Sequence, residues 1–159
     1  AHIREAFFTQ WAGMREWHSR QMAYADRHGQ VISPLGRIRR LPDVWSGVPY
    51  LQSGAQRQAI NSPVQGMASD LLQTAAASMQ GLVYGEMAIP GLRLVGTVHD
   101  SLVAELPEEG WEEVADQVVS RMENLNGILR RMGVAFDVPL VADYSVGTRW
   151  SLSDVSDPT

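Results

Sequence analysis

Apolar residues recur every three or four positions between residues 3 and 28, which is the spacing of one face of an α-helix. Gly29 follows directly, and a glycine in this place ends many helices because it adopts the left-handed conformation without steric cost. Residues 30–53 hold three prolines and two glycines between short apolar pieces. We therefore expect one amphipathic helix over 3–28, then a small hairpin and an irregular loop.

A second helix is expected within residues 54–84, which are rich in Ala, Gln, Leu and Met. Proline is favoured in the first turn of a helix, so Pro63 indicates a start there. Ser62 stands in the capping position before it, and Gln65 in the position that completes a capping box. The pattern predicts a long helix that begins after Ser62 and runs to about Tyr84.

Two apolar stretches, residues 92–98 and 101–106, are separated only by His99 and Asp100. Apolar runs joined by two residues are typical of a β-hairpin, with the dipeptide at its tip. Magnesium binds carboxylate oxygens, so Asp100 is a candidate metal ligand. The alternative is that Asp100 only satisfies the geometry of the turn, as Asp often does.

The remaining pattern predicts a helix over residues 107–132, with Pro107 in its first turn and Gly133 after its end. Residues 136–146 predict one more strand, for which Pro139 indicates an edge position or a strand start. Together these elements predict an α+β fold, in which an antiparallel hairpin and a further strand pack against long helices. A chain of 159 residues is expected to form one compact unit.

Composition excludes several kinds of site. The sequence has no cysteine, which excludes disulfides, zinc–thiolate sites and thiol nucleophiles and favours a cytoplasmic protein. No apolar run approaches the ~20 residues that span a bilayer, so we expect no membrane partner. The chain begins with Ala1 and not with methionine, and its first residues do not have the pattern of a signal peptide. We therefore expect position 1 to be a cut or processed end.

The charge is unevenly distributed along the chain. The net charge is −5, but residues 1–66 hold eight arginines and four acidic residues, whereas residues 67–159 hold five arginines and fourteen acidic residues. A basic surface beside an acidic body suits a protein that contacts phosphates with one side only. Ordinary scatter of surface charge is the alternative.

Two groups of polar residues are candidates for nucleic-acid binding. Arg57, Asn61 and Gln65 are spaced four apart and would lie along one side of a continuous helix, from which they could reach base edges in a minor groove. Alternatively, Gln65 completes the capping box and the others are solvated. The basic segment 36–42, which contains Arg37, either binds phosphate or forms a charged surface loop.

The order of several motifs resembles that of family A DNA polymerases, from near the first residue to about Trp150. Separate matches in family order are far more specific than any single one. The matching segments are Gly-Arg-Ile-Arg-Arg-Leu-Pro at 36–42, Arg-Gln-Ala-Ile-Asn-Ser-Pro-Val-Gln-Gly at 57–66, Ala-Ser-Asp-Leu-Leu at 68–72, Val-His-Asp at 98–100 and Val-Pro-Leu-Val-Ala-Asp-Tyr-Ser-Val-Gly-Thr-Arg-Trp at 138–150.

The resemblance implies roles for individual residues. Asp100 becomes one of two aspartates that bind two catalytic magnesium ions, and His99 lies near the primer terminus. Arg57, Asn61 and Gln65 contact primer and template in the minor groove, and Arg37 joins them as a DNA-binding residue. The implied activity is template-directed DNA synthesis, in which a deoxynucleoside triphosphate (dNTP) is joined to the 3′-hydroxyl of a primer annealed to its template.

The resemblance also implies a division of the chain and a partner. Residues 1–53 correspond to a helix and basic loop at the junction of fingers and palm, and residues 54–159 to the palm subdomain at the carboxyl end of the right-hand polymerase fold. The family's first aspartate motif and its nucleotide-binding helix have no match within the chain. We therefore expect a split polymerase or a fragment, inactive alone and dependent on a second, N-terminal chain.

Two departures from the family pattern keep other functions open. Ser101 follows Asp100 where the family usually has Glu, and Met67 replaces a usual threonine. Ser101 motivates the alternative of a non-catalytic DNA-binding or scaffolding module with the palm shape. A small hydrolase that uses His99 and Asp100 is disfavoured, because no serine or cysteine nucleophile stands in a recognisable setting.

Overall fold

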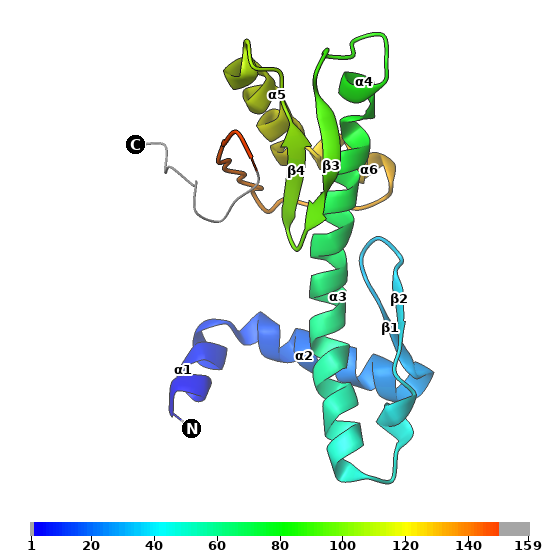
Figure 1. Ribbon diagram of the computed structural model, residues 1–159. Coiled ribbons are helices and arrows are strands. Elements are labelled where there is room, and N and C mark those ends of the chain that lie inside the picture. The colour runs from blue at the N-terminus through cyan, green and yellow to red at the C-terminus, as the bar shows by residue number, and fades with distance from the viewer. Residues whose placement is uncertain (1, 150–159) are drawn as a thin grey trace. The chain divides into compact units, whose positions relative to one another are not determined.

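The computed structural model describes residues 2–149 and divides the chain into two compact units, residues 1–70 (unit 1) and 71–159 (unit 2). The expectation of one compact unit was wrong. The boundary lies within one long helix, α3 (Pro49–Ser78), which contributes residues to both units (Figure 1). The division at residue 53 rests on subdomains of the resembling family and stays a prediction.

Unit 1 begins with two helices in place of the single helix expected. Helix α1 (His2–Gln10) and helix α2 (Ala12–His28) are separated at Trp11, whose φ of −119° and ψ of 60° are not helical. Gly13 stands just after the break, and glycine has low helix propensity, so a continuous helix gains little there. The predicted stop is confirmed: Gly29 has φ +64° and donates its N–H to the Ala25 carbonyl at 2.7 Å.

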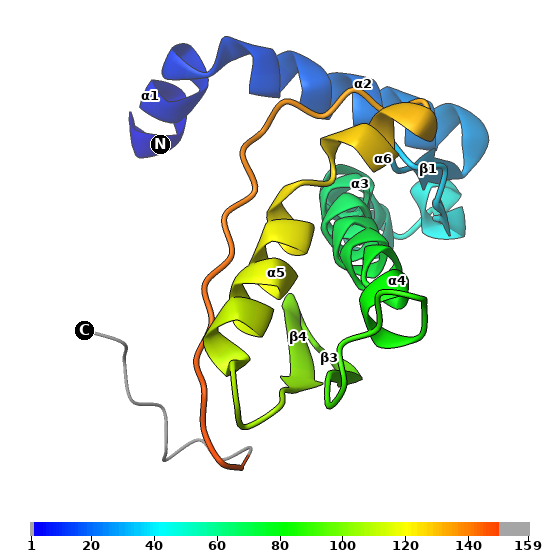
Figure 2. The ribbon, with the colours of Figure 1, turned by 90° about the horizontal axis from the view of Figure 1, so that it is seen from above.

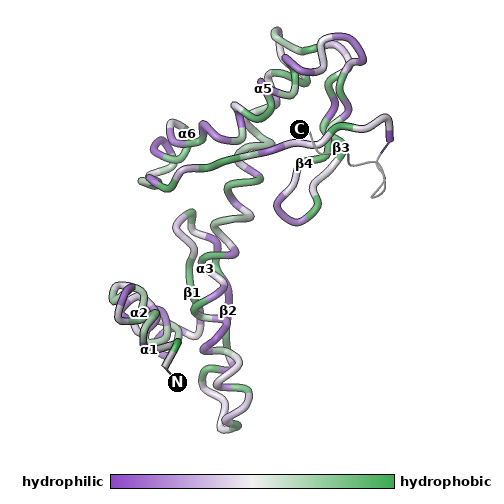
Figure 3. Tube along the Cα trace, turned by 90° about the vertical axis from the view of Figure 1, so that its left-hand side faces the viewer, coloured by the Kyte–Doolittle hydropathy of each residue, from purple (hydrophilic) through white to green (hydrophobic). Residues whose placement is uncertain are grey.

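The predicted small hairpin is confirmed. Strands β1 (Gln30–Ile32) and β2 (Ile38–Arg40) pair antiparallel, and a short 3₁₀ helix, η1 (Pro42–Trp45), follows them. Figure 3 shows the hydrophilic stretch that the arginines give to β2. The Trp45 indole N–H donates to the Asp26 carbonyl at 2.7 Å, which ties η1 to α2.

Helix α3 passes straight through Pro63, so the predicted start after Ser62 was wrong. Proline in a helix interior removes one hydrogen bond and costs about 3 kcal/mol. The turns before it are nevertheless helical because they bury Ala55 and Ala59 in the core of unit 1. That core also contains Ala25, Val31, Leu41 and Val44. The helix ends at Ser78, before the predicted Tyr84, and the short helix α4 (Gln80–Val83) follows.

The hairpin expected in unit 2 is confirmed. Strands β3 (Arg93–Val98) and β4 (Ser101–Glu105) pair antiparallel, with Val98 opposite Ser101. The register shifts between Leu94 and Gly96, so the ladder contains a bulge. Bulges strengthen the local twist of a strand pair.

The helix predicted over 107–132 forms as two shorter helices, α5 (Trp111–Glu123) and α6 (Asn126–Arg131). Residues 107–110 lie outside α5. The break falls at Asn124, whose side-chain amide donates to the Ser120 carbonyl at 2.8 Å. Such a local side-chain bond competes with continuation of the helix. The predicted stop at Gly133 is confirmed, with φ +81° just after α6.

The hairpin of unit 2 is joined to α4 and α5 by an apolar core. Its buried members are Leu82, Leu92 and Val114, and Ala104 of β4 and Val118 of α5 pack against them. Figure 2 shows α5 running beside the hairpin.

The strand predicted over residues 136–146 does not form. This stretch runs as an extended segment, and Figure 2 shows it passing alongside α5. The Ala142 N–H donates to a Glu123 carboxylate oxygen at 2.9 Å, and the rings of Trp111 and Tyr144 meet edge to face at 6.4 Å. A strand is defined by a paired ladder, and Pro139 has no N–H to donate. Trp150, at the end of the last family motif, lies outside the described residues.

No helix within residues 2–149 is long and apolar enough to cross a membrane.

The helices and the two antiparallel hairpins of the described residues confirm the predicted α+β class, without the further strand.

Gly29 is predicted to stabilise unit 1 because no other residue fits its position without strain. A Cβ at Gly29 would lie 2.5 Å from the Trp45 ring, and its φ of +64° strains any L side chain. We expect Gly29→Ala to lower the free energy of unfolding by about 1–3 kcal/mol, measured by urea denaturation. Gly13→Ala is the matched control, since nothing lies within 4 Å of its Cβ position. Equal stability of the two variants would contradict the strain argument.

Candidate nucleic-acid interface and hairpin turn

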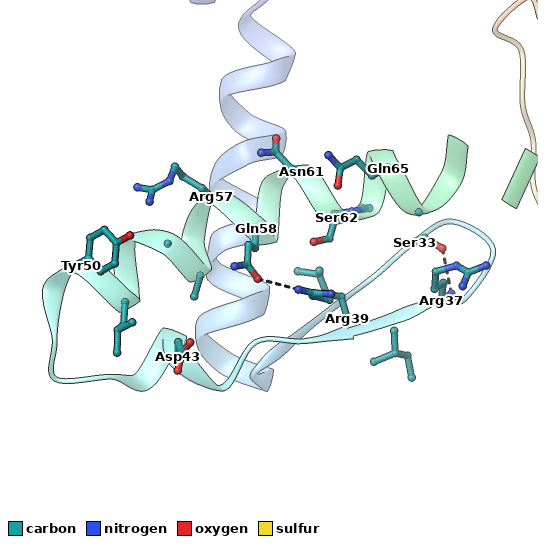
Figure 4. Close-up of a pocket in the computed structure, with 17 residues that line it drawn as sticks. Ser33, Arg37, Arg39, Asp43, Tyr50, Arg57, Gln58, Asn61, Ser62 and Gln65 are labelled. Atoms are coloured by element: carbon teal, nitrogen blue, oxygen red, sulfur yellow. Dashed lines mark hydrogen bonds between the residues drawn. The ribbon is translucent and has the colours of Figure 1, made fainter. Parts of the chain in front are cut away.

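An open groove of about 900 Å³ in unit 1 lies between the β1–β2 hairpin and the first turns of α3. Figure 4 shows its lining residues, in which Arg57, Asn61 and Gln65 project from the same side of α3. All three side chains are exposed. Because α3 is continuous, they span about 12 Å along its axis, which equals three to four base-pair steps of duplex DNA.

The hairpin side of the groove contributes positive charge. Arg37 and Arg39 line it together with Arg57, whereas Asp43 is the one acidic lining residue among those described. An Arg39 guanidinium nitrogen lies 3.4 Å from the Gln58 side-chain oxygen (Figure 4). Arg57 is oriented by its own helix, since it donates to the Ser53 hydroxyl at 2.7 Å. The net positive lining favours an anionic ligand.

Arg37 is engaged within the protein as well as lining the groove. Its Nε donates to the Asp70 carboxylate at 3.0 Å, and its Nη2 bonds the same carboxylate oxygen. The hydrogen bond and the charge of Asp70 raise the pKa of Arg37 above its ordinary value. Arg37 therefore stays a guanidinium cation. Asp70 accepts hydrogen bonds from two of its five N–H donors.

His99 and Asp100 form the two-residue turn between β3 and β4. His99 has φ +55°, and it is the one non-glycine residue with positive φ in the described chain. Histidine, asparagine and aspartate are the residues that most often tolerate this region. Both side chains are exposed at the tip. The turn therefore presents imidazole and carboxylate to solvent on a backbone fixed by the flanking ladder.

The chemistry of the β3–β4 turn fits a single carboxylate ligand to magnesium. Within residues 2–149 no group of three or more His, Asp or Glu side chains is arranged to hold a metal ion. A magnesium ion usually takes only one or two protein carboxylates and completes its shell with water and substrate phosphates. Asp100, exposed and carboxylate-bearing, can supply one such ligand.

The sequence-predicted residues fall into two groups. Arg37, Arg57, Asn61 and Gln65 line one groove of unit 1, whereas His99 and Asp100 belong to unit 2. The sequence reasoning missed the ion pair of Arg37 with Asp70. Gly66, four residues before Asp70 and so on the same helix face, is the signal that could have indicated a close contact there.

Comparison with known proteins shows the family to which the chain belongs. A sequence model of DNA polymerase family A matches residues 1–152. This chain belongs to DNA polymerase family A. It is 34% identical to the thermostable DNA polymerase I of Thermus filiformis over 92% of its own length and 16% of that protein. It is 31% identical to DNA polymerase theta of Drosophila melanogaster, over 93% of its length and 7% of that protein.

The family A fold is supported by a solved structure as well. The POL domain of Pol1 from M. smegmatis, in complex with DNA primer-template and dNTP, superposes with a TM-score of 0.68 and 28% sequence identity. The match covers 76% of this chain and 21% of that one. The expected membership in the family and the part of a right-hand polymerase fold are thereby confirmed. The chain spans about a sixth of the bacterial relatives it matches.

Proposed function

We propose that this chain takes part in template-directed DNA synthesis, joining nucleotides from dNTPs to the 3′-hydroxyl of a primer. One observation carries the proposal: in a family A chain, the motif residues Arg57, Asn61 and Gln65 lie along one exposed side of a positively lined groove. Primer–template DNA is the proposed occupant.

The chemistry of these three side chains suits duplex DNA of any sequence. Every base pair presents acceptors in its minor groove, namely N3 of the purine and O2 of the pyrimidine. Arginine and the two amides supply N–H donors for such acceptors. Contacts of this kind test the shape of a base pair without selecting a sequence, as a template-directed enzyme requires.

Asp100 is the proposed metal ligand. Two bound magnesium ions would supply activation of the primer 3′ oxygen and stabilisation of charge on the leaving pyrophosphate. The protein's own contribution is positional: the β3–β4 ladder holds Asp100 at the tip, and His99 beside it is proposed to lie near the primer terminus. We propose that the second aspartate and the nucleotide-binding residues come from outside residues 1–159, in a cytoplasmic polymerase.

The chain of residues 1–159 is expected to extend no primer by itself. A single aspartate at the proposed site cannot organise two metal ions. The measurement is extension of a labelled primer with magnesium and all four dNTPs, by the isolated chain and by the assembled polymerase that includes the other aspartate. Extension by the isolated chain would overturn the partner requirement.

Asp100→Ala in the assembled polymerase is expected to lower kcat for extension at least about 100-fold, because a metal ligand is lost. Binding of primed DNA should change less than about threefold, since Asp100 is outside the groove. Asp116→Ala, which removes an exposed carboxylate from α5, is the matched control. Near-normal extension by Asp100→Ala, with DNA binding independent of magnesium, would favour the non-catalytic module that Ser101 suggests.

Arg57→Ala, Asn61→Ala and Gln65→Ala are each expected to weaken binding of primed DNA about 5- to 150-fold, because each loses a minor-groove contact of about 1–3 kcal/mol. The dissociation constant is measured by fluorescence anisotropy with primers of several sequences, and the loss should be similar for all of them. Arg27→Ala removes the same charge from an exposed position of α2 outside the groove lining and should change the affinity little. Unchanged affinity in all three variants would contradict the groove as the DNA interface.

A further inference from the structure

Asp70 joins both ends of the β1–β2 turn to helix α3. Its carboxylate accepts hydrogen bonds from Arg37, at the end of the turn, and from the Ser33 hydroxyl at 3.3 Å, at the start. The Ser33 hydroxyl in turn accepts the Arg37 backbone N–H at 3.1 Å. The Asp70 side chain is 12% exposed, so these bonds are shielded from solvent on the carboxylate side.

The turn also lies directly on the backbone of α3. A Cβ at Gly66 would lie 3.3 Å from the Ser33 Cβ and 3.7 Å from the Arg37 Cδ. Gly66 follows Gln65, and both line the groove with Ser33 and Arg37. The turn is itself closed by hydrogen bonds from Ser33 N–H to the Arg37 carbonyl and from Gly36 N–H to the Ser33 carbonyl, both at 2.9 Å. The turn and Gly66 therefore line one end of the groove, and Asp70, which lies outside the lining, holds the turn in place.

We propose that Asp70 is a positioning residue for DNA: through Arg37 and Ser33 it holds the turn against Gly66 and so fixes the groove beside Gln65. This inference rests on the proposed function, because it takes the groove to be the DNA interface. Arg37 then acts on DNA by holding the turn. The competing role for Arg37 is a direct contact with a DNA phosphate. In that case the Asp70 carboxylate would only neutralise part of the positive charge that Arg37 offers to DNA.

The two roles of Arg37 differ in their salt dependence. Loss of a phosphate contact reduces the magnitude of the negative slope of log K for DNA association against log salt concentration by about 0.9, because one counterion fewer is released. Loss of a positioning contact weakens binding without changing that slope. A purely structural ion pair would lower the melting temperature and leave the affinity of the folded protein unchanged.

The experiment uses the assembled polymerase and measures its dissociation constant for primed DNA at several salt concentrations, its kcat at saturating DNA and its melting temperature. We expect Asp70→Ala to raise the dissociation constant about tenfold, with kcat within about twofold and an unchanged salt slope. Arg37→Ala should behave alike, and the double variant should be no worse than either single one, because both remove the same contact.

Two milder variants keep the test valid if Asp70→Ala does not fold. Asp70→Asn keeps the shape and one carbonyl acceptor for Arg37, so its dissociation constant should rise less than that of Asp70→Ala. Gly66→Ala leaves every charge in place but presses on Ser33, and it should also raise the dissociation constant with an unchanged slope. Arg27→Ala, which removes a charge from α2 outside the groove lining, is the control.

The outcomes separate this inference from the proposed function. Wild-type or tighter binding by Asp70→Ala, or a salt slope lowered by about 0.9 in Arg37→Ala, would overturn the positioning role. Asn61→Ala serves as the reference in the same titrations. If Asn61→Ala weakens binding and the Asp70 and Gly66 variants do not, only the present inference fails; if Asn61→Ala is also neutral, the groove itself is not the DNA interface.

Discussion

Burial of the small-residue face of α3 beneath the β1–β2 hairpin and η1 is the contact on which the groove depends. Ala55 and Ala59 have almost no exposed surface, and they share a core with Val31 and Val44. Side chains this small let two backbones approach closely, so the hairpin and the helix form two sides of one groove. The same burial keeps α3 helical ahead of Pro63, and without that continuity Arg57, Asn61 and Gln65 would not share a side.

The second site depends on a different constraint, the closure of a hairpin with only two residues. Such a turn needs a residue with positive φ, and here His99 takes that conformation. A non-glycine residue in this region costs of order 1–3 kcal/mol, and the ladder on both sides compensates for it. The result is a carboxylate held on rigid backbone at an exposed tip. That arrangement suits the role of metal ligand proposed for Asp100.

The charge at the groove differs in sign from the net charge of the chain. Three arginines of unit 1 line the groove, and among these Asp70 pairs with Arg37, which anchors the turn. Arg39 and Arg57 remain available to an anionic ligand from the groove lining. A chain with net charge −5 can still have such a groove, since attraction of an anionic ligand requires local rather than total positive charge.

The sequence by itself determined the features that rest on short-range physics. Both hairpins, the His99–Asp100 turn and the stops at Gly29 and Gly133 follow from alternation and from residues suited to positive φ. The ordered motifs also identified the family, and with it the residues that line the groove. Arg57, Asn61 and Gln65 were named in advance by these motifs, whereas their placement on one side of a helix depends on the continuity of α3 through Pro63.

Tertiary structure decided what depends on distant partners. Pro63 favours a helix start locally, but burial of Ala55 and Ala59 extends the helix before it. Residues 136–146 have a strand's composition, yet they are held by side-chain contacts to α5, and no strand within residues 2–149 pairs with them. The pairing of Arg37 with Asp70 spans 33 residues, and no local pattern encodes a bond between side chains that only folding brings together.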